Sequence, residues 1–251
     1  MTMESVAGKV AFISGASRGI GAGLAERYAE LGMKLVLCSR SAPILPEGED
    51  VMSRATDVRD EAAIESLVRE AEDRFGAIDL WVNNAGVLEP VKPIRDVSTE
   101  AFREHLEVNL VGVFIGVRAY IAHRRRFTTT AGQDGILINV SSGAAWNAYQ
   151  GWGAYCAGKA AVERLTEVVA EEERDTGLRV YSIAPGVVDT PMQDLVRAST
   201  VEDFPEVERF REMKRDDGLN SVGFVADEFL AIAFDPDRRP DEVALRLENE
   251  K

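Results

Sequence analysis

The sequence predicts an α/β fold, with a doubly wound parallel sheet and helices on both faces. Short apolar runs alternate with segments at helical spacing along most of the chain, which is typical of strand–helix–strand units in a parallel sheet. A length of 251 residues and an apolar fraction of 45 % suit one sizeable core. Because such crossovers are right-handed, we expect a single Rossmann-type domain over residues 1–251.

The first elements show both patterns clearly, the short apolar run of a buried strand and the helical spacing of an amphipathic helix. Residues 9–14 form a short apolar run that ends at glycines, as a buried strand does. Residues 19–31 place Ile20, Leu24 and Tyr28 on one helix face, and residues 60–75 repeat this spacing with Ile64 and Leu67. The same criteria predict further strands at 35–38, 51–58, 78–83, 135–141 and 179–183, and further helices at 100–124 and 155–176.

Two segments break the alternation. Residues 41–50 contain Pro43 and Pro46 and lack helical spacing, so we expect the helix between the second and third strands to be short or absent. Residues 187–220 are long and polar, with one helix-like piece at about 204–215. Because this segment follows a strand, we expect it to cover the substrate beyond the carboxyl end of the sheet.

Composition disfavours several partner classes. A formal net charge of −14 repels nucleic acid and anionic lipid. Two cysteines, Cys38 and Cys156, and two histidines, His105 and His123, lack metal-ligand spacing, so we expect no metal site and no disulfide framework. We find no apolar signal region and no apolar run long enough to span a bilayer. A cytoplasmic protein with a small-molecule partner is therefore expected.

A glycine-rich turn joins the first strand to the first helix. Residues 14–21 read SGASRGIG, with glycines at Gly15, Gly19 and Gly21. Glycine permits a tight turn, and the following helix N-terminus offers free N–H groups to a pyrophosphate. The spacing differs from the general dinucleotide fingerprint G-x-G-x-x-G. Its position at the first strand–helix junction nevertheless favours a dinucleotide site.

The end of the second strand indicates which dinucleotide binds. NAD-binding proteins place a carboxylate there for the ribose 2′-hydroxyl, whereas an arginine accommodates a 2′-phosphate. This strand ends in Cys38-Ser39-Arg40, and Arg18 in the glycine turn adds a second cation. Both arginines could instead be ordinary surface cations. The pattern predicts NADP(H) as the cofactor.

Three polar side chains suggest proton transfer to a carbonyl. Tyr155 and Lys159 are four residues apart at the start of a helix and share a face. We expect the ammonium to lower the pKa of the phenol, so that Tyr155 can donate a proton as hydride reaches carbon. Ser142, at the end of the preceding strand, can stabilise the same oxygen. Asn109 lies among apolar helix positions, where its amide needs a partner.

Together these motifs resemble the short-chain dehydrogenase/reductase family over almost the whole chain. The matching elements are Gly15-x-x-x-Gly19-x-Gly21, Asp57, Asn83-Asn84-Ala85-Gly86, Asn109, Ser142, Tyr155-x-x-x-Lys159 and Pro185-Gly186. Ser14 stands where the family usually has threonine and keeps the hydroxyl.

The resemblance implies a catalytic tetrad of Asn109, Ser142, Tyr155 and Lys159, in which Asn109 holds a water in a proton relay to Lys159. It also implies that Asp57 and Val58 meet the adenine ring and that Thr190 touches the carboxamide. The implied cofactor site comprises Gly15, Ser17, Arg18, Gly19, Ile20, Gly21, Ser39, Arg40, Asp57, Val58, Asn84, Ala85, Gly86, Tyr155, Lys159, Pro185, Gly186, Val188 and Thr190.

A narrower resemblance concerns the substrate. Residues 149–161 and 184–193 are similar to the sepiapterin and benzil reductase branch, which implies reduction of one ketone of a vicinal dicarbonyl or of a pterin side chain with NADPH. Glu248 only approximates the C-terminal aspartate that holds the pterin in the sepiapterin enzymes. An aromatic loop and an apolar segment are expected to form the substrate pocket, with candidates Trp146, Tyr149, Trp152, Val187, Met192 and Leu195.

The same residues also allow two other functions, and the sequence suggests that the protein forms an oligomer. An alcohol dehydrogenase that runs toward oxidation with NAD(P) would use the same residues, and a regulator that senses NADPH would do no chemistry. Helices 100–124 and 155–176 carry apolar residues on more than one face, among them Val113, Phe114, Val117, Val162 and Val169. We expect them to pair in a homo-oligomer, a dimer or a tetramer, as the resemblance implies.

Overall fold

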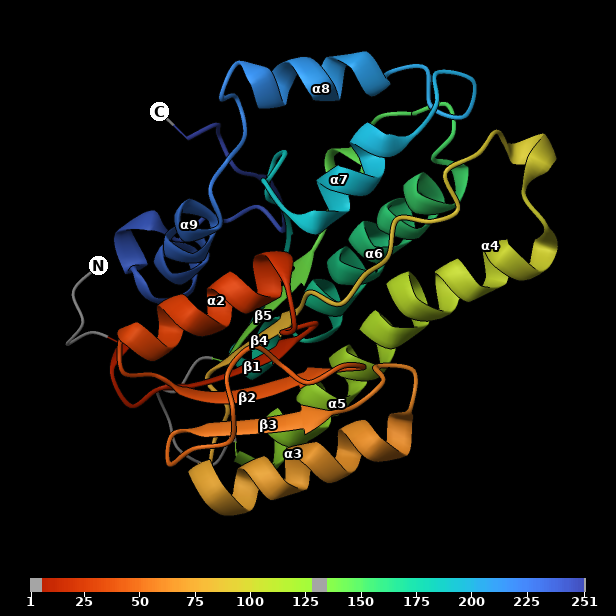
Figure 1. Cartoon of the computed structure of the whole chain (residues 1–251). Coiled ribbons are helices and arrows are strands. Elements are labelled where there is room, and N and C mark those ends of the chain that lie inside the picture. Colours follow the sequence, from red (N-terminus) through yellow and green to blue (C-terminus); the bar gives the residue numbers. More distant parts are fainter. Residues whose placement is uncertain (1–5, 128–134, 251) are drawn as a thin grey trace.

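The sheet is entirely parallel. A computed structural model of the chain describes residues 6–127 and 135–250, and these residues form a seven-stranded sheet in the order β3-β2-β1-β4-β5-β6-β7 (Figure 1). This is the order of a doubly wound Rossmann-type fold, extended by one strand. The strands are β1 Val10–Ser14, β2 Lys34–Ser39, β3 Val51–Ala55, β4 Leu80–Asn83, β5 Gly135–Val140, β6 Leu178–Ala184 and β7 Ala244–Arg246.

Helices cover both faces of the sheet, and short helical turns lie in the connections between the elements (Figure 1). The helices are α2 Gly19–Glu30, α3 Glu61–Phe75, α4 Thr99–Leu106, α5 Gly112–Phe127, α6 Gly153–Glu172, α7 Pro191–Ala198, α8 Val207–Arg215 and α9 Val222–Phe234. The short turns are η1 Ile94–Asp96, η2 Glu107–Val111, η3 Gly143–Ala145, η4 Arg174–Thr176 and η5 Pro236–Arg238.

Two apolar layers enclose the sheet. On one face, α2 and α9 pack against alternate strand residues such as Ile13 and Leu37. On the other face, α3, α5 and α6 pack against the intervening residues, among them Phe12 and Trp81, whose rings stack. Strands that are buried on both faces explain why the sequence shows continuous apolar runs rather than alternation.

Most predicted elements are present, and the single Rossmann-type α/β domain is confirmed. Residues 41–50 contain no helix, as expected from their prolines. The segment 187–220 contains α8 close to the predicted piece, but it also contains α7, which the sequence analysis missed. It missed α9 and β7 as well. The expectation about an N-terminal signal region falls partly on residues 1–5, which lie outside the described residues.

The predicted helix 100–124 is one long helical segment with a π-helical turn. It comprises α4, the π turn η2 and α5. The expectation that no apolar run could span a bilayer was wrong, because Thr99–Phe127 is long and apolar enough by length and composition. However, 56 % of its apolar stretch is buried inside the protein, as in the core helix of a soluble fold.

The argument for pairing of helices needs correction. Val113, Val117, Val162 and Val169 are buried against the sheet of their own chain. These four side chains therefore form no solvent-exposed apolar face. On α5 the large apolar side chain that remains exposed is Phe114, at 43 %.

Candidate active site

The glycine turn is locked to the loop after β4. Gly15 has φ +72°, and a Cβ atom there would lie 2.8 Å from Ala85 Cα. The Ser14 hydroxyl accepts hydrogen bonds from the backbone N–H groups of Asn84 (3.1 Å) and Ala85 (3.2 Å). Asn84 Nδ2 returns a bond of 2.9 Å to Ser14 O. The serine that replaces the usual threonine thus uses its hydroxyl to join the two predicted cofactor loops.

The loop after β6 closes the other side of the turn. A Cβ atom on Gly19, which has φ +59°, would lie 3.5 Å from the side chain of Thr190. Asn220, buried, donates from Nδ2 to Pro185 O at 2.9 Å, and its backbone N–H donates to Val187 O at 2.8 Å. The structure therefore brings the first strand–helix junction and the Pro185-Gly186 loop together.

The start of α2 fits an anionic group. Within the described residues no side chain caps its first N–H groups, and its first turn contains no acidic residue. Arg18, at the N-cap, and Arg40, after β2, are both exposed. Free helix N–H groups next to cations suit a pyrophosphate and an additional phosphate. The donor set thus fits a phosphorylated dinucleotide.

Asp57, the predicted adenine contact, follows β3. Arg59 donates to Asp57 from Nη2 at 2.6 Å and from its backbone N–H at 3.0 Å. Hydrogen bonds from Arg59 lower the pKa of Asp57, and the charge of Arg40 contributes to the same shift. Arg40, the predicted 2′-phosphate ligand, therefore lies within electrostatic reach of the predicted adenine contact.

The other predicted cofactor residues lie on the same loops. Ser17 is in the glycine turn, and Ile20 and Gly21 are in the first turn of α2. The Ser39 hydroxyl donates to Ser41 O at 2.6 Å, and Val58 lies against Gly112 of α5. Val188 is buried and forms a bridge with Asn220.

Asn109 bridges the π turn to the loop after β4. Its Oδ1 accepts from the backbone N–H of Val87 at 3.1 Å, and its Nδ2 donates to Val87 O at 2.9 Å. A Cβ atom on Gly86 would lie 2.8 Å from Asn109 Oδ1, so glycine is needed for this approach. The amide that the sequence left without a partner is thus bonded on both of its sides.

Ser142, Tyr155 and Lys159 come together at the start of α6. Burial raises the pKa of Tyr155, and its hydrogen bond with Ser142 opposes that shift. Lys159 is buried, and its ammonium donates to Val140 O at 2.7 Å. Burial lowers the pKa of Lys159 to about 8. The expected lowering of the phenol pKa by the ammonium is wrong for this structure, because burial of the phenol raises its pKa.

A small apolar cluster contains the ring of Tyr155 and several side chains of the segment 187–220, among them Phe204 and Phe210. Trp152 stacks on Phe204, with centroids 4.6 Å apart and planes 3° apart, and meets Tyr155 edge-on at 5.7 Å. The partly buried residues packed against this cluster include three predicted pocket residues, namely Tyr149, Val187 and Met192.

Two predicted pocket residues lie outside this cluster. Trp146 is 44 % exposed and donates its indole N–H to Glu163 on α6. Leu195 is 41 % exposed on α7. The indole turns toward α6 because the carboxylate offers its N–H an acceptor, and the structure does not place Trp146 in the cluster with Tyr155.

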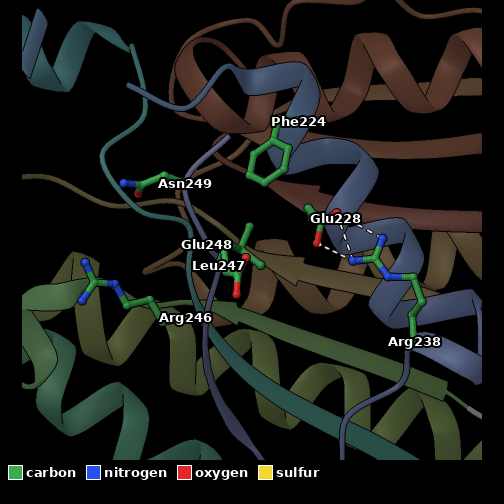
Figure 2. A pocket seen from close by; sticks show the side chains of 7 residues that line it. All are labelled: Phe224, Glu228, Arg238, Arg246, Leu247, Glu248 and Asn249. Atoms are coloured by element: carbon green, nitrogen blue, oxygen red, sulfur yellow. Dashed lines mark hydrogen bonds and ion pairs between the residues drawn. The ribbon is translucent and has the colours of Figure 1, made fainter. Parts of the chain in front are cut away.

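A separate cavity of about 390 Å³ lies at the C-terminal tail. It is lined by Phe224, Glu228, Arg238, Arg246, Leu247, Glu248 and Asn249. Figure 2 shows that Glu228 and Arg238 pair with each other, whereas Arg246 points away from them. Glu248 thus lies in this cavity, among residues that include none of the tetrad. We therefore place the candidate active site at the glycine turn and Tyr155.

The sequence analysis missed several residues of this region. His105 contacts Asn109, Asn220 braces the Pro185-Gly186 loop, and Phe204 and Phe210 complete the apolar cluster. Arg59 engages Asp57. The spacing of four between His105 and Asn109 on a helix was a usable signal, whereas the others depend on contacts between distant segments.

Comparison with known proteins identifies the family. The family model for short chain dehydrogenases matches residues 9–200. The chain belongs to the short-chain dehydrogenase family. It is 32 % identical to a benzil reductase ((S)-benzoin forming) of Bacillus subtilis (strain 168) over 226 residues, which cover 88 % of this chain and 91 % of that protein. The identity to the benzil reductase ((S)-benzoin forming) of Bacillus cereus is 34 % over 227 residues, covering 85 % and 89 %.

A solved structure agrees over nearly the full chain. The crystal structure of the KRED1-Pglu enzyme is similar with a TM-score of 0.84 and 32 % identity, covering 95 % of this chain and all of that one. The fold, the family and these relatives make this family member an NAD(P)-dependent oxidoreductase that acts on carbonyl or alcohol groups.

Proposed function

We propose that the protein is an NADPH-dependent carbonyl reductase whose substrate is a compact, partly aromatic vicinal dicarbonyl. The observation that carries the proposal is the position of Tyr155 in the apolar cluster, with the ammonium of the buried Lys159 5.7 Å from the centroid of its ring. It joins a proton donor, a cation and an apolar surface at one place.

The chain's own residues supply the proton and stabilise charge. When bound, NADPH supplies hydride to the carbonyl carbon. Tyr155 donates its phenolic proton to the carbonyl oxygen, and the Ser142 hydroxyl donates a hydrogen bond that stabilises negative charge on the same oxygen. The Lys159 ammonium is bonded to Val140 O and lies 5.7 Å from the centroid of the Tyr155 ring, so it supplies positive charge at the reacting end of α6. Asn109 braces the adjoining loop through Val87.

Two arginines support a preference for NADPH. Arg18 and Arg40 are exposed at the end where a Rossmann-type fold holds the adenosine ribose. No carboxylate follows β2 within residues 39–41. Charge-assisted bonds to a 2′-phosphate contribute about 1.5–3 kcal/mol each. The glycine turn and the start of α2 would hold the pyrophosphate.

The surroundings of Tyr155 support an apolar, planar substrate. Trp152, Tyr149 and Met192 lie in or against the cluster that contains its ring. These side chains offer stacking and adaptable apolar contact, but no cation for a carboxylate. The similarity to two benzil reductases favours a vicinal dicarbonyl. If these aromatic side chains only pack the segment 187–220, this substrate preference fails while the reductase assignment stands.

A side-by-side assay tests the proposal. Purified protein is assayed with NADPH and with NADH against benzil, 1-phenyl-1,2-propanedione, sepiapterin, acetophenone and an acetoacetyl thioester. We expect the highest kcat/KM for a dicarbonyl with NADPH. A higher value for acetophenone or the thioester would contradict the substrate class. Faster oxidation of the matching alcohols with NAD would favour a dehydrogenase, and no turnover in either direction would favour a regulator.

A further inference from the structure

His105 has a defined hydrogen-bonding state in the last turn of α4. It is 1 % exposed, and its Nδ1 lies 2.7 Å from Glu89 O. Because a carbonyl oxygen only accepts, Nδ1 carries the proton. Nε2, which lies 2.9 Å from Asn109 Nδ2, is then free to accept from the amide. The ring thus connects the loop after β4 to Asn109.

Asn109 depends on this acceptor to complete its hydrogen bonds. The amide is fully buried, and its Nδ2 group has two hydrogens. One bonds to Val87 O at 2.9 Å, and the other points to His105 Nε2, with His105 O a longer alternative at 3.3 Å. A buried donor without a partner is costly, so removal of the ring nitrogen favours a different amide orientation.

His105 also lies against the helix that carries Tyr155. The two rings meet edge-on at 6.0 Å with an angle of 82°. A Cβ atom on Gly158 would be 3.6 Å from both His105 Nε2 and Asn109 Cβ. Burial lowers the pKa of His105, the hydrogen bond to Glu89 opposes this, and the charge of Lys159 lowers it further. A neutral ring therefore fills the space over the turn between Tyr155 and Lys159.

We propose that His105 is a positioning residue that orients the Asn109 amide and sets the distance between the π turn and the turn of α6 that carries Tyr155. The inference rests on the proposed function, since it assigns a role relative to Tyr155 and Asn109. It predicts that the acceptor at Nε2, and not only the bulk of the ring, is needed for turnover.

His123 provides a matched control. It lies on the same helical segment, is fully buried and also uses both ring nitrogens. Its Nδ1 lies 2.7 Å from Glu72 Oε1, and its Nε2 accepts from Ile78 N at 2.9 Å. None of these partners belongs to the candidate active site. Loss of His123 should therefore lower stability without lowering kcat.

The experiment compares three variants with wild type. His105→Phe keeps a ring without the acceptor, His105→Gln restores an acceptor and a donor, and His123→Phe is the control. With benzil and NADPH we expect His105→Phe to lower kcat about 10- to 100-fold. The KM for NADPH should change less than about twofold, and His105→Gln should recover most of the loss. His123→Phe should lower Tm and leave kcat unchanged.

The side-chain NH₂ signal of Asn109 in NMR spectra gives a second readout that does not need turnover. We expect slow exchange in wild type and His105→Gln, and fast exchange in His105→Phe. Equal kcat in wild type and His105→Phe, or equal losses in both His105 variants, would overturn the inference while the reductase assignment stands. Absence of turnover in wild type would overturn the proposed function, and the NH₂ exchange would then decide the role of His105.

Discussion

Lys159 and Tyr155 share one face of α6, yet the Lys159 ammonium bonds to Val140 O and lies 5.7 Å from the centroid of the Tyr155 ring. Burial lowers the pKa of Lys159 to about 8 and raises the pKa of Tyr155. Both groups are thus shifted toward their neutral forms. Burial of the Lys159 ammonium near the phenol therefore lowers the stability of the folded protein.

Lys159→Met tests this cost through the pH dependence of stability. The native pKa of about 8 lies below the ordinary value of 10.5, so the unfolded chain binds more protons between these values and wild-type stability rises with pH across that window. The full difference corresponds to about 3 kcal/mol. The free energy of unfolding of the variant, relative to that of wild type, should therefore be highest at pH 7 and should fall toward pH 10. Urea unfolding at both pH values measures it, and a difference that does not change with pH would contradict the burial argument.

Arg40→Asp should shift cofactor preference from NADPH toward NADH. The substitution removes a phosphate ligand and adds a carboxylate for the ribose hydroxyls. The ratio of kcat/KM for NADPH to that for NADH should fall at least about tenfold, which corresponds to the loss of one charge-assisted bond. Arg69→Asp makes the same charge change on exposed α3 and should leave the ratio unaltered. An unchanged ratio in Arg40→Asp would reject the assigned role.

The sequence predicted those parts of the site that depend on local spacing. The glycine turn, the Tyr155-x-x-x-Lys159 pair and the strands buried on both faces each have a signal within a few residues. The sequence analysis missed α9 because this helix lacks the polar face by which a surface helix is recognised. Residues such as Ala226, Phe229 and Ala233 are buried in it.

Contacts between distant segments could not be read in this way. The bond from Lys159 to Val140 O and the stacking of Trp152 on Phe204 join residues 19 and 52 positions apart. Trp146 and Trp152 look equivalent in the sequence. In the structure the Trp146 indole bonds to Glu163, whereas the Trp152 ring stacks on Phe204. Their different surroundings arise from tertiary packing alone.

Phe204→Ala should loosen the segment over the site. The ring is fully buried between Trp152 and Phe210, and such truncations cost about 3–5 kcal/mol. We expect faster hydrogen exchange in residues 191–215 and a raised KM for benzil, with little change in the KM for NADPH. Val201→Ala, at a half-exposed position of the same segment, is the control. Global loss of stability without a rise in KM would show that the segment does not shape the pocket.

Phe114→Glu tests self-association. Phe114 and Val168 are 43 % and 45 % exposed on α5 and α6, the two helices expected to pair between copies. We expect the wild-type protein to scatter light as a dimer or tetramer at micromolar concentration, and Phe114→Glu to reduce the mass. Leu195→Glu, equally exposed on α7, should not. A wild-type monomer would contradict the expectation.

Tyr155→Phe is the most direct test of the proposed function. The variant keeps the ring that packs on Trp152 and loses only the hydroxyl that donates the proton. Benzil-dependent oxidation of NADPH should fall about 10²- to 10⁴-fold, the usual contribution of general acid catalysis, while the Kd for NADPH stays close to wild type. A loss smaller than about tenfold with unchanged NADPH binding would show that Tyr155 is not the proton donor.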